Sequence, residues 1–184
     1  MAGATGGGRL LARGSPTQWR DRKPVTEGKT GSGAYSAEEL RRIAREGLPV
    51  LVLSKSMTRC NAVAKEIHAL SGVEGPFIRY TCRPLTPREG QLRSLSERCA
   101  SLFDRADSGT LYFHQVDALS SQEQRQLYSV LESGRYWKPE ANRMEPVHFR
   151  IVASSFPEIL HSGLAPDLLY RLGARVIELR DSGE

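Results

Sequence analysis

The sequence predicts an α/β fold in which a parallel sheet is covered by helices on both faces. One observation is that apolar runs such as Leu48–Leu53 are continuous, which is typical of strands buried on both faces. The other is that such runs alternate along the chain with segments of helical periodicity. Strands that alternate with helices form parallel sheets in three layers.

The composition restricts the class of protein. The chain has 184 residues, of which 39% are hydrophobic and 26% are charged, and these values are ordinary for a soluble globular protein. No apolar run approaches the roughly 18 residues that a membrane span needs, and the N-terminus lacks the apolar segment of a secretory signal. We expect a cytoplasmic protein that does not contact a membrane, although an arginine-rich, acid-poor start also occurs in organelle transit peptides.

Cysteine and histidine show no metal-ligand spacing. The three cysteines form no CxxC pair and the four histidines are scattered; they are Cys60, Cys82, Cys99, His68, His114, His148 and His161. An odd number of unpaired cysteines is typical of a reducing compartment. We expect neither disulfides nor a metal site.

The first 35 residues form a separate region. They contain eight of the 17 glycines and carry +4 of the net charge of +5, with too few apolar residues to form a core. We expect a disordered basic tail over residues 1–35 and one α/β domain over residues 36–184. Within the tail, Gly28–Thr30 looks like the end of a phosphate loop, but Lys23 replaces the glycine that such a loop needs. We interpret this match as a coincidence of composition.

The first half of the domain begins with a capping box, Ser36–Glu39, which predicts a helix that ends at Gly47. Leu48–Leu53 is a predicted strand, followed by a seven-residue loop, Ser54–Cys60, and a helix over Asn61–Leu70. A strand–loop–helix unit of this kind carries the phosphates in nucleoside-triphosphatases. The next predicted elements are a strand at Phe77–Tyr80, a proline-containing loop at 83–90, a helix at Gln91–Asp104 and a strand at Thr110–Val116.

The second half begins with another capping box, Ser120–Glu123, which opens a helix that Gly134 closes. Residues 135–146 are predicted as a surface hairpin or loop, on which the pair Tyr136-Trp137 is either a contact site or a cover for the sheet edge. The remaining predicted elements are a strand at His148–Ala153, a helical turn at Phe156–His161, a helix at Pro166–Leu172 and a strand at Arg175–Leu179.

Several segments match one family in their order and spacing. They are Val63–Ser71, Gly75–Phe77, Thr81-Cys82, Leu102–Phe113, Leu119-Ser120, Gln124, Val130–Gly134, Phe149–Ser155 and Asp167–Leu172. Together these segments, which cover roughly residues 40–180, resemble the ATPase domain of bacterial sigma-54-dependent transcription activators, a branch of the AAA+ proteins. The resemblance implies a three-layer P-loop NTPase-like (AAA+) fold.

The resemblance also implies a nucleotide site, whose positions in the loop are Ser54, Lys55, Met57, Thr58, Arg59, Cys60 and Asn61. Three family glycines correspond to Ser54, Met57 and Arg59, and the family lysine corresponds to Cys60. Glycine allows the positive φ angles that turn backbone N–H groups toward phosphate, and cysteine cannot neutralise a phosphate. Lys55 or Arg59 could supply a nearby cation instead.

Other positions that the resemblance assigns to catalysis are also changed. Two carboxylates that hold magnesium and orient water correspond to His114 and Gln115, and a helix cap is the expected role of Asp117. The first of the family's trans-acting arginines corresponds to Ala165, whereas Arg171 is retained. We expect His114 to pack or hydrogen-bond locally.

The segments that couple the family's ATPase to its target also differ. Arg83–Leu102 is too short to contain the family's GAFTGA loop, and the sequence stops at Glu184, before the family's helical lid. We therefore expect no catalytic residues and no cofactor. The expected function is that of an inactive AAA+-like regulatory module that binds a protein partner, for instance an intact AAA+ relative.

Two alternatives remain at this stage. One is a sigma-54-type regulator with residual ATP or ADP binding, because helix N-termini attract anions. The other is a scaffold that binds nucleic acid through its basic tail, although a tail whose arginines only provide solubility is favoured.

Overall fold

The computed structural model describes residues 25–26, 36–84, 101–160 and 163–179. The Gly28–Thr30 match, most of the tail, residues 85–90 of the predicted loop 83–90 and the first ten residues of the predicted helix Gln91–Asp104 lie outside the described residues. The end of that helix is described, since residues 101–105 are helical.

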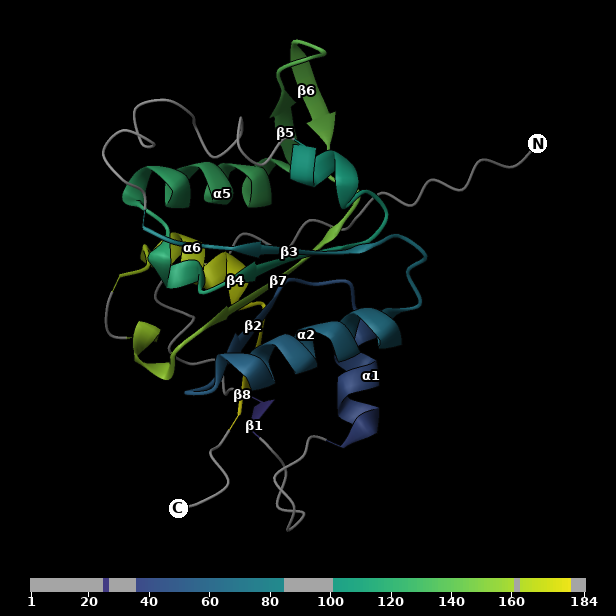
Figure 1. Ribbon diagram of the computed structural model, residues 1–184, viewed down its shortest axis with the longest axis vertical. Coiled ribbons are helices and arrows are strands. Elements are labelled where there is room, and N and C mark those ends of the chain that lie inside the picture. Colours follow the sequence, from purple (N-terminus) through teal and green to yellow (C-terminus); the bar gives the residue numbers. More distant parts are fainter. Residues whose placement is uncertain (1–24, 27–35, 85–100, 161–162, 180–184) are drawn as a thin grey trace, which may run out of the picture.

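A six-stranded parallel sheet forms the centre of the domain, in the order β1-β8-β2-β7-β4-β3. Its strands are β1 (Val25–Thr26), β2 (Val50–Leu53), β3 (Phe77–Thr81), β4 (Thr110–His114), β7 (Arg150–Ser155) and β8 (Arg175–Glu178). The helices are α1 (Ala37–Arg45), α2 (Met57–Ser71), α5 (Ser121–Ser133) and α6 (Pro166–Leu172). Figure 1 shows α5 and α2 on opposite sides of the sheet, as the predicted three-layer fold requires.

Each face of the sheet has its own apolar core. Val50, Val52 and Tyr112 face α1 and α2, whereas Leu51 and Phe113 pack with residues of α5 and α6. Successive side chains of a strand point to opposite faces, so the continuous apolar runs of the sequence supply both cores.

Several element ends agree with their sequence signals. Ser120 and Glu123 form a complete capping box at the start of α5, and Gly134 ends that helix with a φ of 65°. At α1 the Ser36 hydroxyl accepts a hydrogen bond from the Glu39 N–H (3.2 Å). The bounds of α6 are those predicted.

Some predicted strands begin or end elsewhere. The strand predicted at Leu48–Leu53 begins only at Val50, and the strand predicted at Thr110–Val116 ends at His114. The strand predicted at His148–Ala153 is shifted to Arg150–Ser155. The β4 strand ends early because Val116 is buried in a 3₁₀ turn and not in the ladder. The β7 strand ends late because the polar Ser154 and Ser155 pair with Val52 and Leu53 of β2.

The expectation of disorder over residues 1–35 fails at two positions. Val25–Thr26 form β1, which pairs in parallel with Ile177 and Glu178 of β8. The β8 edge is therefore covered by a segment that composition alone placed in the tail.

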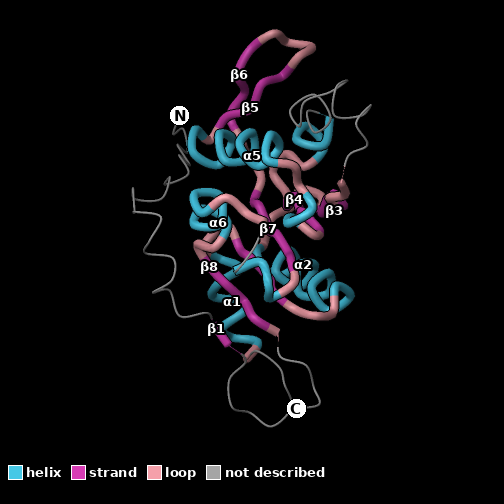
Figure 2. The backbone as a smooth tube through the Cα atoms, turned by 90° about the vertical axis from the view of Figure 1, so that its left-hand side faces the viewer, coloured by secondary structure: helices cyan, strands magenta, loops and turns pink. Residues whose placement is uncertain are grey.

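A two-stranded antiparallel hairpin follows α5, as predicted for residues 135–146. Its strands are β5 (Arg135–Lys138) and β6 (Arg143–Pro146). Figures 1 and 2 show the hairpin projecting beyond α5, away from the sheet. In the described part of the chain, no helix has the length and apolar character that crossing a membrane requires.

Candidate functional site

The carboxyl ends of β2, β4 and β7 lie side by side at one end of the sheet. We call it the carboxyl end of the sheet, and it is the candidate site. In open α/β sheets, ligands bind outside the carboxyl ends of the strands. Leu53 lies opposite Ser155 in the β2–β7 pair, and the Ser54 N–H donates to the Ser155 carbonyl (3.2 Å). The register therefore brings the start of the loop that follows β2 next to the end of β7.

The predicted seven-residue loop is much shorter than expected, because α2 begins at Met57 instead of Asn61. Ser56 is the N-cap, and its hydroxyl accepts from the Arg59 N–H at 3.5 Å. The Ser54 hydroxyl accepts from the Ser56 N–H at 3.0 Å. Serine is a favoured N-cap residue, and without glycines the segment that follows continues as an ordinary helix. Two of the backbone N–H groups that could face an anion, those of Ser56 and Arg59, are thus bonded within the chain.

Cys60, the residue that the resemblance matches to the family lysine, lies inside the protein. Its side chain is fully buried, and its Sγ lies 3.9 Å from the Val52 carbonyl oxygen of β2. Burial raises the pKa of the Cys60 thiol to about 12, so the group is neutral at pH 7. It packs α2 onto the sheet and supplies no charge to the carboxyl end of the sheet.

The other loop positions divide into exposed and partly buried side chains. Lys55 and Thr58 are exposed, while Met57, Arg59 and Asn61 are partly buried. The Asn61 Oδ1 is a buried acceptor, and no described residue donates a hydrogen bond to it. This oxygen therefore retains spare hydrogen-bonding capacity.

His114 ends β4 and takes part in a buried polar chain on the α2 side of the sheet. Its Nδ1 lies 3.0 Å from the Tyr112 hydroxyl, which lies 2.7 Å from the Ser154 hydroxyl. Burial, with the charge of Arg79, lowers the pKa of His114. The imidazole is therefore neutral near pH 7, and one ring nitrogen is engaged within the chain.

Gln115 does not continue the strand as the predicted boundary required. It has a φ of 59°, a left-handed conformation that few residues other than glycine adopt readily, and the chain then enters a 3₁₀ turn at Val116–Ala118. Gln115 therefore does not extend β4.

Asp117 is not the helix cap that the sequence suggested, because Ser120 fills that position. Its Oδ1 accepts from the Ser155 hydroxyl at 2.6 Å. Sequence reasoning missed this pair, and nothing local in the sequence indicates it, since 38 positions separate its members. It joins the end of β7 to the turn after β4.

The two positions that the resemblance matches to trans-acting arginines, Ala165 and Arg171, are both held within the domain. Arg171 is buried and forms an ion pair with Glu132 of α5. The Ala165 N–H donates to the Gln124 Oε1 (2.8 Å), and the Gln124 Nε2 donates to the Gly163 carbonyl (2.8 Å). These contacts fix α6 and the segment before it against α5.

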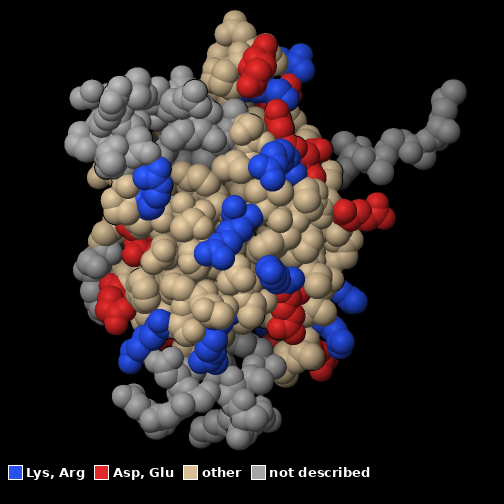
Figure 3. Space-filling model, viewed as in Figure 1, with Lys and Arg blue, Asp and Glu red and all other residues tan. Residues whose placement is uncertain are grey.

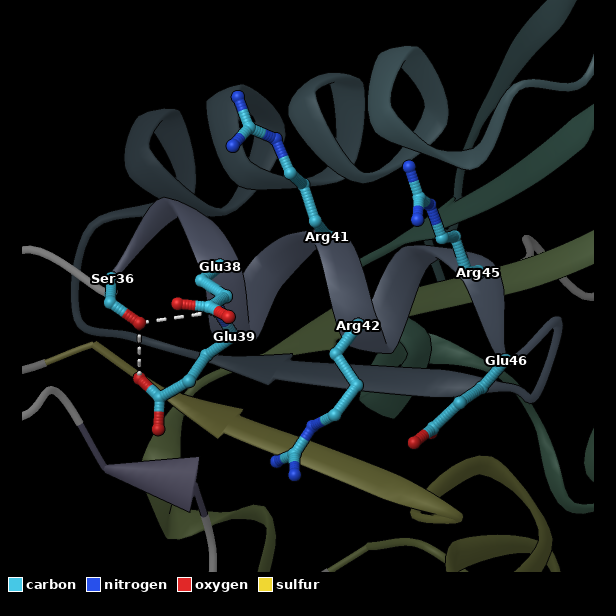
Figure 4. A pocket seen from close by; sticks show the side chains of 7 residues that line it. All are labelled: Ser36, Glu38, Glu39, Arg41, Arg42, Arg45 and Glu46. Carbon is cyan, nitrogen blue, oxygen red and sulfur yellow. Dashed lines mark hydrogen bonds between the residues drawn. The ribbon is translucent and has the colours of Figure 1, made fainter.

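A surface depression lies along α1 and not at the carboxyl end of the sheet described above. It is lined by Ser36, Glu38, Glu39, Arg41, Arg42, Arg45 and Glu46. In Figure 4, Arg42 points to the opposite side of α1 from Arg41 and Arg45. Charges of both signs line this depression, and they are also mixed over the face seen in Figure 3. Among the described residues, no group of three or more metal-ligating side chains is present.

Comparison with known proteins decides the family. The model of the sigma-54 interaction domain matches residues 27–178. The chain belongs to the sigma-54 interaction domain family. It is 28% identical to the Nif-specific regulatory protein of Azotobacter vinelandii over 77% of the chain and 30% of that protein. It is 26% identical to the Psp operon transcriptional activator of Escherichia coli K12 over 83% of the chain and 51% of that protein.

Solved structures place the domain in the P-loop NTPase (AAA+) fold. NtrX from Brucella abortus, in complex with ATP, superimposes with a TM-score of 0.68 at 21% identity, over 82% of this chain and 36% of that one. The P-loop NTPase domain of a sigma-54 activator from E. coli gives 0.51 at 16% identity, over 72% of this chain and 97% of that one. The chain spans 25–30% of the Nif-specific regulatory proteins that it matches in A. vinelandii and Rhodobacter capsulatus.

Proposed function

We propose that this sigma-54 interaction domain is a catalytically inactive AAA+ module that acts in transcription regulation through contact with another protein. The observation that carries the proposal is the start of α2 at Met57, where the hydroxyls of Ser54 and Ser56 accept backbone N–H groups. An anion that bound the N–H groups of Ser56 and Arg59 would have to displace both hydroxyls. It would meet no lysine at position 60, because the neutral thiol of Cys60 points under the helix.

The end of β4 supports the same proposal. Mg²⁺ prefers oxygen ligands in octahedral geometry, and imidazole suits softer metals. His114 is buried and hydrogen-bonded to Tyr112, and Gln115 cannot act as a general base. Asp117 is the nearest carboxylate in the sequence, and its Oδ1 accepts from Ser155. These residues do not fit a bound ATP–magnesium complex, and we assign no catalytic step to them.

The arginine positions add a third, independent line of support. A trans-acting arginine must reach a nucleotide in a neighbouring subunit, whereas Arg171 is buried against Glu132 of its own chain. Ala165 has no charge to offer. We propose that this region holds α5 and α6 together.

We propose a protein as the partner, of which an intact AAA+ relative is one example. The family description names an interaction with sigma-54, and relatives are named as transcriptional activators. A preserved domain core beside a changed nucleotide site is what an interaction module needs.

Calorimetry with ATP and magnesium tests the proposal, together with an assay of phosphate release. We expect no saturable heat and no phosphate above the buffer level. NtrX of B. abortus, which has been crystallised with ATP, is the positive control for binding. Saturable binding accompanied by magnesium-dependent phosphate release would refute the proposal.

A regulator that retains ATP or ADP binding is the second candidate. It is favoured by the cationic Lys55 and Arg59 near the start of α2. This candidate predicts saturable ATP binding without turnover that is lost in Lys55→Ala and Arg59→Ala. Lys65→Ala, an exposed position of the same helix, is the matched control.

A further inference from the structure

The hairpin carries an exposed apolar face that the proposed function does not yet use. Trp137 and Met144 lie opposite each other in the β5–β6 pair, as do Arg135 and Pro146. Alternation along the strands places these four residues on one face, which we call the outer face of the hairpin. Trp137 and Met144 are each 40% exposed, among the few large apolar side chains of the described residues that remain so accessible.

The opposite face of the hairpin anchors it to the domain. The Tyr136 hydroxyl donates to the Asp104 Oδ1 (2.5 Å), and the Lys138 Nζ lies 2.7 Å from the Asp104 Oδ2. The Tyr136 ring packs edge-on against Phe103, with a centroid separation of 5.0 Å. The outer face is therefore held in place from behind, and a binding surface of fixed shape loses less conformational entropy when it binds.

The charges near the outer face leave one cation beside the apolar pair. Lys138 pairs with Asp104, and Arg143 pairs with Glu145 (2.7 Å). Arg135 is exposed, and its Nη2 donates only to a neutral acceptor, the Met144 carbonyl (2.9 Å). In the described residues, the guanidinium thus meets no carboxylate and can accept one from outside.

We propose that the outer face binds a segment of a partner protein in which an apolar side chain lies next to a carboxylate. Tryptophan and arginine are the residue types that dominate binding energy at protein interfaces, and methionine adapts to varied apolar surfaces. Arg135 would form a charge-assisted hydrogen bond with the carboxylate. This inference rests on the proposed function, for which it names the chemical class of the partner.

The same charges argue against a nucleic acid at this face. Binding to a phosphate backbone requires several cations that each neutralise a phosphate. Here Lys138 and Arg143 are already paired with carboxylates, and Arg135 stands beside tryptophan, methionine and proline. Figure 3 shows acidic as well as basic side chains on the hairpin, at the top of the view.

Selection from a displayed library of random peptides tests the proposal on the full chain. We expect the enriched peptides to combine aromatic or aliphatic residues with aspartate or glutamate. The chain has two tryptophans, so Trp19→Phe leaves Trp137 as the only one, and its emission should change when a selected peptide is added. Enrichment of peptides without acidic residues, or of none, would overturn the proposal.

Variants locate the binding site through the anisotropy of a labelled selected peptide. We expect Trp137→Ala and Arg135→Glu each to weaken binding about tenfold or more. Val73→Ser is the matched control, because Val73 is similarly exposed (38%) and lies outside the hairpin; it should bind as the parent does. Met144→Ser tests the same face if Trp137→Ala does not fold. Unchanged affinity in the hairpin variants, or labelled duplex DNA bound through Trp137, would refute the assignment.

The two proposals can fail separately. Peptide binding at the hairpin together with ATP turnover would reject the inactive module and leave the hairpin site intact. An absence of ATP binding together with an absence of selected peptides would do the reverse.

Discussion

At the scale of single residues, Ser54 and Ser56 occupy backbone N–H groups at the carboxyl end of the sheet. Each presents a hydroxyl oxygen that accepts a backbone N–H, one from Ser56 and one from Arg59. In a phosphate loop these N–H groups are directed toward the ligand. Here both N–H groups are bonded within the chain, and this arrangement argues against phosphate binding through them.

Ser56→Ala tests this N-cap directly. We expect the free energy of unfolding to fall by about 1 kcal/mol, since alanine is a poor N-cap residue, with no gain of ATP binding because Cys60 and His114 are unchanged. Chemical denaturation measures the loss. Thr58→Ala, an exposed position in the first turn of α2, is the control and should change stability little. Equal losses in both variants would show that the Ser56 cap does not stabilise the helix.

At the scale of elements, α1 depends on an arginine from the far part of the chain. The guanidinium of Arg150, in β7, donates to the carbonyls of Ile43 (2.7 Å), Ala44 (2.5 Å) and Leu48 (3.2 Å). The last carbonyls of a helix have no partner within it, and a cation near them is favoured by the helix dipole. Burial lowers the pKa of Arg150 to about 10, which still leaves it charged at pH 7. One side chain thus ties α1 to the sheet.

Arg150→Met should destabilise the domain by about 3 kcal/mol, because buried carbonyls lose their partners and each unsatisfied group costs about 1–3 kcal/mol. Arg175→Met is the matched control: Arg175 pairs with Glu46 (2.6 Å) near the same end of α1, but its side chain is 40% exposed. Exposed ion pairs contribute at most about 1 kcal/mol. Unfolding by denaturant compares the two variants, and similar losses would contradict the role assigned to Arg150.

At the scale of the whole molecule, the sheet has a buried centre and a less buried edge. Every residue of β2, β4 and β7 is buried, whereas β3 has two exposed residues, Arg79 and Thr81. β4, β7 and β2 are neighbours at the centre, and β3 ends the sheet. Stability is expected to follow this order, because strands buried on both faces open only with the whole domain.

Amide hydrogen exchange measures that distribution. We expect the slowest exchange in β2, β4 and β7, and exchange that is faster by orders of magnitude in the hairpin, which opens locally. β3 should be intermediate, with its protected amides on the β4 side. Uniform protection across the sheet and the hairpin would show instead that the domain opens as a single unit.

Much of the architecture could be predicted from local patterns. The capping box at Ser120 and Glu123 and the glycine at position 134 mark the two ends of α5 correctly, and Pro166 marks the start of α6. The structure starts α2 four residues before the predicted Asn61, because Ser56 caps the helix and no glycine interrupts Met57–Cys60. Of the predicted site residues, the structure places Ser54 and His114 at the carboxyl end of the sheet and turns Cys60 away from it.

The sequence by itself determined the fold class, the family resemblance and the residue types at the positions that the resemblance matches to a nucleotide site. These properties depend on periodicity and spacing, which are local and survive without any knowledge of packing. Only the tertiary structure decided where the side chains of Arg150, Asp117 and Arg171 find their partners, at separations of 38 residues or more along the chain for the first two. Such pairs depend on strand order and register, because a shift of one residue moves a side chain to the opposite face of the sheet.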